Sequence, residues 1–336
     1  MKLIWDGGLI IKTRKKHITP DPENKSLKSD LTLVSHAHID HTKGLNGRSK
    51  MLASVETYEI IRTRTSKKID RFSELGYKQI YEEDEFKITS YNAGHVLGSR
   101  QFMIEDKHQS ILFSSDINCV RSLTLDPADQ VEADILIIES TYGKPEYALP
   151  PREETYLEIA EWCLETLGRG KIPVFSAYSL GKSQELIKLL NQYLKIPIVV
   201  DQDIAKISEI YAKSGVNLSF LKAGDEQSKE LIDGKGCVLI VSSNRNLSLE
   251  LKRSDIELAF PSGWALKFKP KSCSASFPLS SHADYYQLID FVSKCSPKKV
   301  YTMHGFCREL AKSINNNLGI RAQPLSNAAQ TSLHDF

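Results

Sequence analysis

The stretch LTLVSHAHIDHTKG, residues 31–44, joins an apolar run to a dense group of histidines. Three imidazoles and one carboxylate fall within six consecutive positions: His36, His38, Asp40 and His41. Neighbouring imidazoles repel one another when protonated and need hydrogen-bond partners when buried, so they add nothing to a hydrophobic core. Imidazole and carboxylate ligands together suit zinc, manganese or iron and argue against calcium. The stretch therefore predicts a metal site.

The place of these residues in the chain supports that interpretation. The run LTLVS (31–35) has the character of a buried strand, and a helix is expected to begin near Thr42. The histidines would then leave the carboxyl end of a strand, where α/β proteins place their chemistry. Residues 36, 38 and 40 can point one way and residue 41 another, so one loop can serve two metal ions.

The remaining ligands are sought by the same rule, as His or Asp at the end of an apolar strand. This gives three candidates: His95 in the glycine-bounded turn GHVLG, Asp116 at the end of SILFSSD, and His304 near the end of KKVYTMHG. Two metal ions about 3.5–4 Å apart form a clamp for phosphate-ester hydrolysis. Such a pair needs about seven or eight ligands, counting four for each ion with shared ligands.

The bulk properties are those of an ordinary globular protein. The chain has 336 residues and a formal net charge of +2, so its global charge does not announce a nucleic-acid ligand. Its six cysteines form no C-x-x-C pair and are interpreted as reduced thiols. No apolar run is long enough to span a membrane, and the N-terminus lacks the order of a signal peptide, so a cytoplasmic location is expected.

The secondary-structure pattern changes twice along the chain. Residues 1–145 show short apolar strands with loops, whereas residues 146–255 alternate strands and helices in the way typical of a parallel sheet. Residues 256–336 return to the first pattern and carry two further histidines, His282 and His304, in strand-end positions. We expect an α/β fold in which the middle segment is inserted into a discontinuous domain.

The motifs resemble those of a known family. H-A-H-I-D-H, G-H-V-L-G-S, the strand-end S-S-D and E-S-T-Y-G of residues 139–143 resemble the metallo-β-lactamase superfamily and, within it, the β-CASP nucleases. That group includes cleavage and polyadenylation endonucleases, ribonuclease J, Artemis-type DNA nucleases and the exonucleases associated with bacterial DNA ligases. The resemblance covers nearly the whole chain. It implies a four-layer αβ/βα metallo-β-lactamase fold with an inserted β-CASP α/β domain.

The resemblance also implies roles for individual residues. A first metal ion would be held by His36, His38 and His95, a second by Asp40, His41 and His304, with Asp116 and a hydroxide bridging them. Asp21 would support the histidines from behind. His282 would be the general acid for the departing oxygen, and Glu139 would orient it. The ions would be two divalent cations, Zn²⁺ first and Mn²⁺ second.

Three positions depart from the family pattern without removing a ligand. Ser115 stands where a glycine often precedes the bridging aspartate, Phe306 follows the H-G pair where ribonucleases often have Glu, and Lys182 stands where Arg is frequent. Lys182 belongs to SAYSLGKS, a loop that runs into a helix N-terminus. Ser179, Lys182 and Ser183 there are candidates for holding nucleic-acid phosphates.

The implied activity is metal-dependent hydrolysis of phosphodiester bonds in single-stranded nucleic acid. The short chain and the segment PSGWALKF (261–268) are similar to the ligase-associated exonucleases and favour DNA, with an RNA-processing endonuclease or exonuclease as the alternative. DNA-repair or RNA-processing proteins would be the corresponding partners. A thioester or lactam hydrolase and a non-catalytic binding subunit are disfavoured, by the long insertion and by the complete set of ligands respectively.

Overall fold

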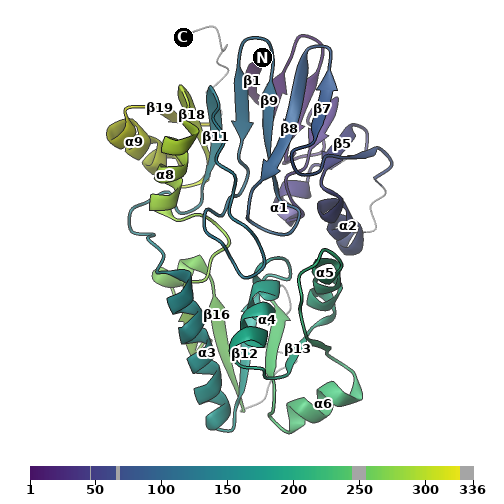
Figure 1. Cartoon of the computed structure of the whole chain (residues 1–336), viewed down its shortest axis with the longest axis vertical. Coiled ribbons are helices and arrows are strands. Elements are labelled where there is room, and N and C mark those ends of the chain that lie inside the picture. The colour runs from purple at the N-terminus through teal and green to yellow at the C-terminus, as the bar shows by residue number, and fades with distance from the viewer. Residues whose placement is uncertain (46, 66–68, 244–254, 326–336) are drawn as a thin grey trace. The chain divides into compact units, whose positions relative to one another are not determined.

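A computed structural model describes residues 1–45, 47–65, 69–243 and 255–325, and these residues form two compact units (Figure 1). Unit 1 consists of Met1–Arg121, Asp126–Ala148 and His282–Phe336. Unit 2 consists of Ser122–Leu125 and Leu149–Ser281. The chain thus enters unit 2 from unit 1 and returns, as an insertion requires.

Unit 1 contains two sheets. The first has the strand order β1-β2-β3-β4-β5-β6 and is parallel from β3 onward. Its strands are β1 (Lys2–Trp5), β2 (Leu9–Lys12), β3 (His17–Pro20), β4 (Leu31–Leu33), β5 (Lys50–Ala53) and β6 (Phe72–Glu74). The helices of this half of unit 1 are α1 (Ile39–Thr42) and α2 (Val55–Arg64), which follow β4 and β5.

The second sheet of unit 1 has the order β19-β18-β11-β10-β9-β8-β7. Its strands are β7 (Ile80–Glu83), β8 (Phe86–Asn92), β9 (Arg100–Glu105), β10 (Ser110–Phe113), β11 (Ile135–Ser140), β18 (Lys299–Gly305) and β19 (Arg321–Pro324). Strands β10, β11, β18 and β19 are parallel neighbours, so their carboxyl ends share one edge. Helices α8 (Tyr285–Cys295) and α9 (Cys307–Leu318) accompany this sheet.

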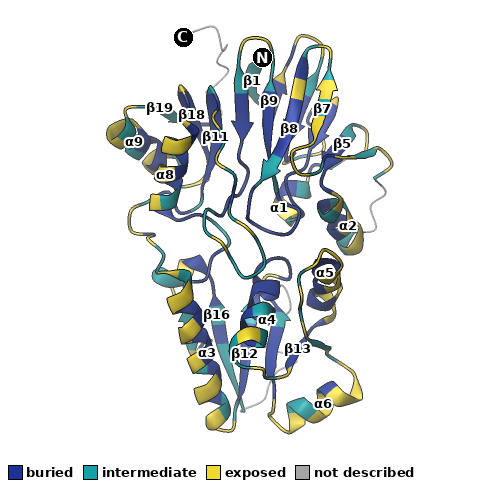
Figure 2. Ribbon diagram, in the orientation of Figure 1, coloured by how far each residue is buried: buried dark blue, intermediate teal, exposed yellow. Residues whose placement is uncertain are grey.

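Two hydrophobic clusters hold these layers together. The first joins the sheets face to face, with Leu33 and Leu52 of the first sheet packed in one cluster with Phe102 and Ile137 of the second. The second lies on the other face of the second sheet, which it joins to α8 and α9 through residues such as Phe291. The residues of both clusters are buried, and much of the ribbon of these strands is coloured as buried in Figure 2. Removing their apolar area from water stabilises the fold.

Unit 2 is built on one parallel sheet of order β14-β13-β15-β12-β16-β17. Its strands are β12 (Ile172–Ala177), β13 (Ile198–Val200), β14 (Leu221–Lys222), β15 (Val238–Ser242), β16 (Ile256–Pro261) and β17 (Ala275–Phe277). Its helices are α3 (Arg152–Gly168), α4 (Lys182–Tyr193), α5 (Gln202–Lys213), α6 (Glu226–Asp233) and the 3₁₀ helix η1 (Gly263–Leu266).

These units confirm the predicted α/β fold, a four-layer metallo-β-lactamase unit with an inserted α/β unit. The boundary predicted at residue 255 needs correction, because β16 and β17 pair in the sheet of unit 2 and the chain returns to unit 1 only at His282. The sequence of an apolar strand has the same pattern in either unit, so only its pairing with neighbouring strands shows to which unit it belongs. The helix expected near Thr42 instead begins at Ile39 and ends at Thr42, so His41 lies on α1.

Candidate metal centre

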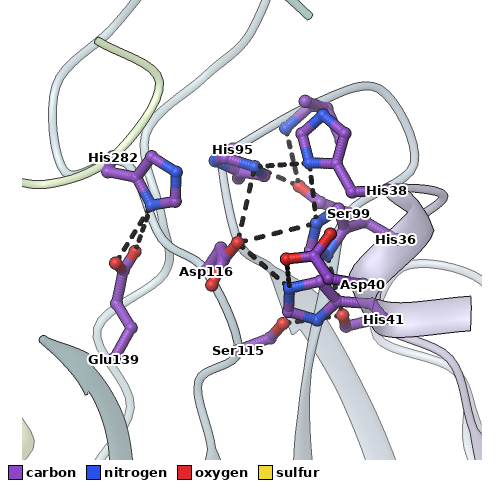
Figure 3. A network of polar contacts seen from close by, with 12 residues as sticks. His36, His38, Asp40, His41, His95, Ser99, Ser115, Asp116, Glu139 and His282 are labelled. Atoms are coloured by element: carbon purple, nitrogen blue, oxygen red, sulfur yellow. Dashed lines mark hydrogen bonds and ion pairs between the residues drawn. The ribbon is translucent and has the colours of Figure 1, made fainter. Parts of the chain in front are cut away.

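The predicted site residues of unit 1 converge because they follow strands with a common direction. Asp21 follows β3 directly, and His36 follows the parallel neighbour β4. Asp116 comes just after β10, while Glu139 and His304 lie in the last residues of β11 and β18. Each pair of parallel strands delivers its polar ends to one edge, which brings residues distant in sequence together (Figure 3).

The first group consists of His36, His38, His95 and Asp116, whose potential ligand atoms all lie within 4.8 Å of one another. The Nδ1 atom of His38 lies 3.0 Å from Nε2 of His36 and 3.1 Å from Nε2 of His95. The Oδ2 atom of Asp116 lies 3.7 Å from Nε2 of both His36 and His95. Ring nitrogens from three histidines and a carboxylate oxygen therefore face a common point.

Asp21 lies behind this group and organises it. Its carboxylate accepts hydrogen bonds from the Ser35 backbone N–H at 2.7 Å and the Ser35 hydroxyl at 2.5 Å. Its Oδ2 atom lies 2.8 Å from Nδ1 of His41, and the Ser35 hydroxyl lies 2.9 Å from Nδ1 of His36. The Nδ1 atoms of both histidines are thus engaged, which leaves their Nε2 atoms to face the centre, as second-layer partners of metal-binding histidines do.

Burial and charge set the protonation of these groups. Burial, reinforced by the neighbouring imidazoles, holds the pKa of His36 well below its usual range, and burial lowers the pKa of His38 to about 4. Burial also opposes a charge on His41, but the carboxylates of Asp116 and Asp21 outweigh it and raise the pKa of His41 well above 6.5. Burial therefore favours the neutral form of His36 and His38, whereas the carboxylates favour the charged form of His41.

The remaining proposed ligands of the second ion lie on the open side. His41 approaches Asp116 at 3.3 Å and Asp40 at 3.5 Å through Nε2. The Asp40 side chain is 68% exposed, and His304 is exposed, with its ring centroid 5.8 Å from that of His41. Asp40 and His304 lie outside the tightly clustered groups of the described residues, whereas Asp116 is central to them.

His282 and Glu139 form a pair beside the centre, and their polar atoms lie within 4.8 Å of each other and of Asp116. Nδ1 of His282 lies 3.1 Å and 3.0 Å from the two carboxylate oxygens of the fully buried Glu139, which also accepts from the Ile117 backbone N–H. The imidazole of His282 lies 4.4 Å, centroid to centroid, from that of His95. The pair therefore holds a half-exposed imidazole next to the first group, in a fixed orientation.

Two hydroxyls in the centre were not singled out as functional from the sequence. Ser115 adopts a left-handed backbone with φ of 54°, which explains why glycine is common there, and its hydroxyl oxygen lies 3.0 Å from Oδ2 of Asp21 and 2.6 Å from the Ser35 hydroxyl oxygen. The guanidinium of Arg64 donates to the Ala37 carbonyl within the histidine loop. Ser35 stands directly before His36 at the end of a strand. This position is the feature of the sequence that could have indicated its role.

The predicted phosphate-binding loop lies in unit 2, at the start of α4. Ser179, Lys182 and Ser183 are all buried, and the Ser183 hydroxyl donates to the Tyr178 carbonyl at 2.7 Å. The Gly181 N–H donates a hydrogen bond to Oε1 of Gln184. The exposed side chain at this position is that of Tyr178.

The chain is similar to several characterised proteins. A family model described as a Zn-dependent metallo-hydrolase RNA specificity domain matches residues 273–323. A probable DNA ligase of Opitutus terrae is 32% identical over 308 residues, covering 90% of this chain and 29% of that protein. An RNase J-like protein of Methanocaldococcus jannaschii is 28% identical over 263 residues, covering 72% of this chain and 59% of that protein. Cleavage and polyadenylation specificity factor subunit 3 of Dictyostelium discoideum is 26% identical over 366 residues, covering 84% and 47%.

These relatives are longer proteins, since the chain spans less than two thirds of the length of each. The two-unit fold and the strand-end histidines define a protein of the metallo-β-lactamase class. Together with these similarities, they indicate the β-CASP nuclease family of that class. None of the helices in the described ranges combines the length and apolarity needed to cross a membrane.

Proposed function

We propose that this protein is a metal-dependent nuclease that hydrolyses phosphodiester bonds in single-stranded nucleic acid. The observation that carries the proposal is the convergence of His36, His38, His95 and Asp116 next to the His282–Glu139 pair. A cluster of ligands beside a separately held imidazole is what hydrolysis of a phosphodiester requires, since charge must be neutralised and a leaving oxygen protonated.

The clustered residues suit a divalent cation, and we propose a pair of such ions. Three imidazoles and a carboxylate meet within 4.8 Å, and the low pKa values of His36 and His38 keep their nitrogens free of extra protons. We assign one ion to His36, His38 and His95, a second to Asp40, His41 and His304, and Asp116 to both. This donor set favours Zn²⁺, with Mn²⁺ as the second candidate. Bound ions would lower the pKa of a water molecule and neutralise charge on the phosphate oxygens.

The protein side chains have distinct tasks in this proposal. Asp21 and Ser35 fix the rings of His41 and His36 through Nδ1. Glu139 fixes His282 through its Nδ1, and Nε2 of His282 would give a proton to the departing oxygen. The apolar core beneath the centre holds these side chains in the positions where their hydrogen bonds form. The side chains therefore need to move little during the reaction.

Two substrates are proposed in order. An exonuclease acting on DNA comes first, because the similarity to the probable DNA ligase spans 90% of this chain. An RNA-processing nuclease comes second. It is favoured by the match of residues 273–323 to a model described as an RNA specificity domain and by the names of the other relatives.

A denaturing-gel time course tests the proposal. DNA and RNA of one unstructured sequence, labelled at the 5′ end, are incubated with Mn²⁺, Zn²⁺ or EDTA. Release of labelled mononucleotide from DNA supports the first substrate, and preferential or internal cutting of RNA supports the second. Cleavage that persists in EDTA, or that is absent with every metal ion, would overturn the proposed function.

A further inference from the structure

Three aromatic side chains gather at one edge of the unit 2 sheet. Tyr178 follows β12 directly, while Trp264 and Phe268 lie on the segment that follows β16. Strands β12 and β16 are parallel hydrogen-bonded neighbours, with Phe175 opposite Ala259, so the residues that follow them leave the same carboxyl edge. We call these three residues the aromatic edge.

The aromatic edge is exposed although its residues are large and apolar. The exposed fractions are 59% for Tyr178, 38% for Trp264 and 58% for Phe268. Single exposed aromatic residues are ordinary on protein surfaces, but three on segments that follow two neighbouring strands concentrate apolar surface, as is typical of binding surfaces.

The segment around Trp264 is held in place by its own hydrogen bonds. The Ser262 hydroxyl accepts from the Trp264 N–H, and the Phe268 N–H donates to the Trp264 carbonyl at 3.0 Å. The Ser262 N–H donates to the Phe277 carbonyl of β17 at 2.9 Å, and the Phe268 ring meets that of Phe260 edge-on. The rings are therefore presented on an ordered segment, which reduces the entropy lost when a ligand binds.

The same segment is basic. Lys267, Lys269 and Lys271 are exposed, and no Asp or Glu occurs in the sequence between Glu257 and Asp284. This local excess of positive charge contrasts with a net charge of only +2 for the whole chain. Lysines attract an anionic ligand, and aromatic faces between them suit flat apolar groups. A nucleic-acid strand with unpaired bases has both the negative charge and the flat groups.

We propose that the aromatic edge stacks the unpaired bases of a single nucleic-acid strand, while the neighbouring lysines contact its phosphates. The inference rests on the proposed nuclease function and specifies its substrate, which would be selected by the accessible faces of its bases. The buried Ser179, Lys182 and Ser183 would shape the loop that carries Tyr178. A duplex would be a poor ligand because its bases are already stacked on one another.

Two fluorescein-labelled oligonucleotides of equal length and charge test this inference, one of thymidines and one with abasic residues, by anisotropy in EDTA with the full-length protein. The wild-type protein should bind the thymidine strand more tightly than the abasic strand. Tyr178→Ala, Trp264→Ala and Phe268→Ala should each reduce the affinity for the thymidine strand by about 5- to 150-fold and leave that for the abasic strand nearly unchanged. Tyr178→Phe and Trp264→Phe keep a ring and should retain most of the preference.

Leu164→Ala is the matched control. Leu164 is 53% exposed and lies in the second half of α3, which leads into the amino end of β12 and thus lies toward the opposite edge of the sheet. Equal binding of both strands by the wild-type protein, or alanine variants that behave like Leu164→Ala, would overturn the stacking inference. If those variants still cleave the strand, the proposed nuclease function stands without it, whereas a wild-type protein that neither binds nor cleaves would overturn both.

Discussion

His282 is the residue whose role depends most on its neighbours. Its imidazole contacts the buried Glu139, whereas Asp21 contacts His41 and Ser35 contacts His36 (Figure 3). A group that is oriented by a carboxylate of its own can exchange a proton without releasing a cation. This separation distinguishes a general acid from a metal ligand.

His282→Ala should therefore retain bound metal and lose activity. We expect the turnover rate to fall by about 10²- to 10⁴-fold, the usual contribution of general acid catalysis. Metal content by mass spectrometry and turnover of a labelled strand are measured on the same preparation. His38→Ala is the control that should lose metal as well. Loss of metal from the His282→Ala variant would make His282 a ligand and contradict the assignment.

Ser115 shows how a residue can accept an unfavourable backbone for the sake of its side chain. Its φ of 54° favours glycine, yet its hydroxyl joins Asp21 to Ser35. The departure from glycine was visible in the sequence, but its reason was not, because the hydroxyl bridges residues 80 and 94 positions away. The proposed ligands were chosen by a pattern that is visible in the sequence, since His36, His95 and Asp116 each follow an apolar strand.

Two variants separate the backbone from the hydroxyl at Ser115. Ser115→Ala loses the hydroxyl and keeps the left-handed strain, whereas Ser115→Gly loses both. The glycine variant should therefore be more stable than the alanine variant by about 1 kcal/mol in free energy of unfolding. Urea unfolding of both proteins in metal-free buffer measures this. An alanine variant of equal or greater stability would show that the backbone at residue 115 relaxes.

At the level of elements, α4 begins with a buried cation in a polar cluster. Arg152 of α3 forms an ion pair with Glu185 of α4 and donates to the Ser280 carbonyl, and Tyr156 donates to the same carboxylate. Lys182 lies beside this cluster, where burial lowers its pKa to about 8 despite the favourable charge of Glu185. The sequence made Lys182 a candidate for binding phosphate, because a helix N-terminus with Lys and Ser has the same sequence pattern whether it is exposed or buried.

The stability of the protein should depend on pH through Lys182. Its pKa is about 8 in the folded protein and near 10.5 unfolded, so the unfolded state binds more protons between these values and stability rises with pH there. Lys182→Met should be more stable than the wild-type protein by up to about 3 kcal/mol below pH 8, and this difference should vanish toward pH 10.5. Urea unfolding from pH 7 to 10.5 measures it.

Lys188→Met provides the control for that series, because Lys188 lies on the same helix with a half-exposed side chain that donates to the Asn217 carbonyl. A constant difference between wild type and Lys182→Met across the range would contradict the assignment of a low pKa to Lys182.

Most elements of the fold could be predicted from periodicity and strand-end residues. The capping box of Asp284 and Gln287, which can be read from the sequence, explains why α8 starts where it does. The end of the insertion could not be predicted. The order of the unit 2 sheet places β16 beside β12 across a long intervening segment, and pairing between distant strands leaves no local trace in an apolar run.

For the whole molecule, the decisive feature is that each unit has a hydrophobic core of its own. The clusters of unit 1 draw on both of its sheets, and those of unit 2 on the sheet around β12 with α3, α4 and α5. All the proposed metal ligands belong to unit 1. A protein built in this way need not unfold in one step, because stabilising one core does not by itself stabilise the other.

Removal of metal should consequently act on one unit. A ligand that binds only the folded state adds RT ln(1 + [L]/Kd) to stability, about 3 to 4 kcal/mol at 100 to 1,000 times Kd. By calorimetry, EDTA should lower the melting temperature of the transition that belongs to unit 1, and excess Zn²⁺ should restore it. Lys182→Met should instead move the other transition. The ring nitrogens of the first group lie about 3 Å apart, so a bound cation would hold them together. Its removal should therefore destabilise unit 1. A single transition, or equal shifts of both transitions with EDTA, would contradict the independence of the two cores.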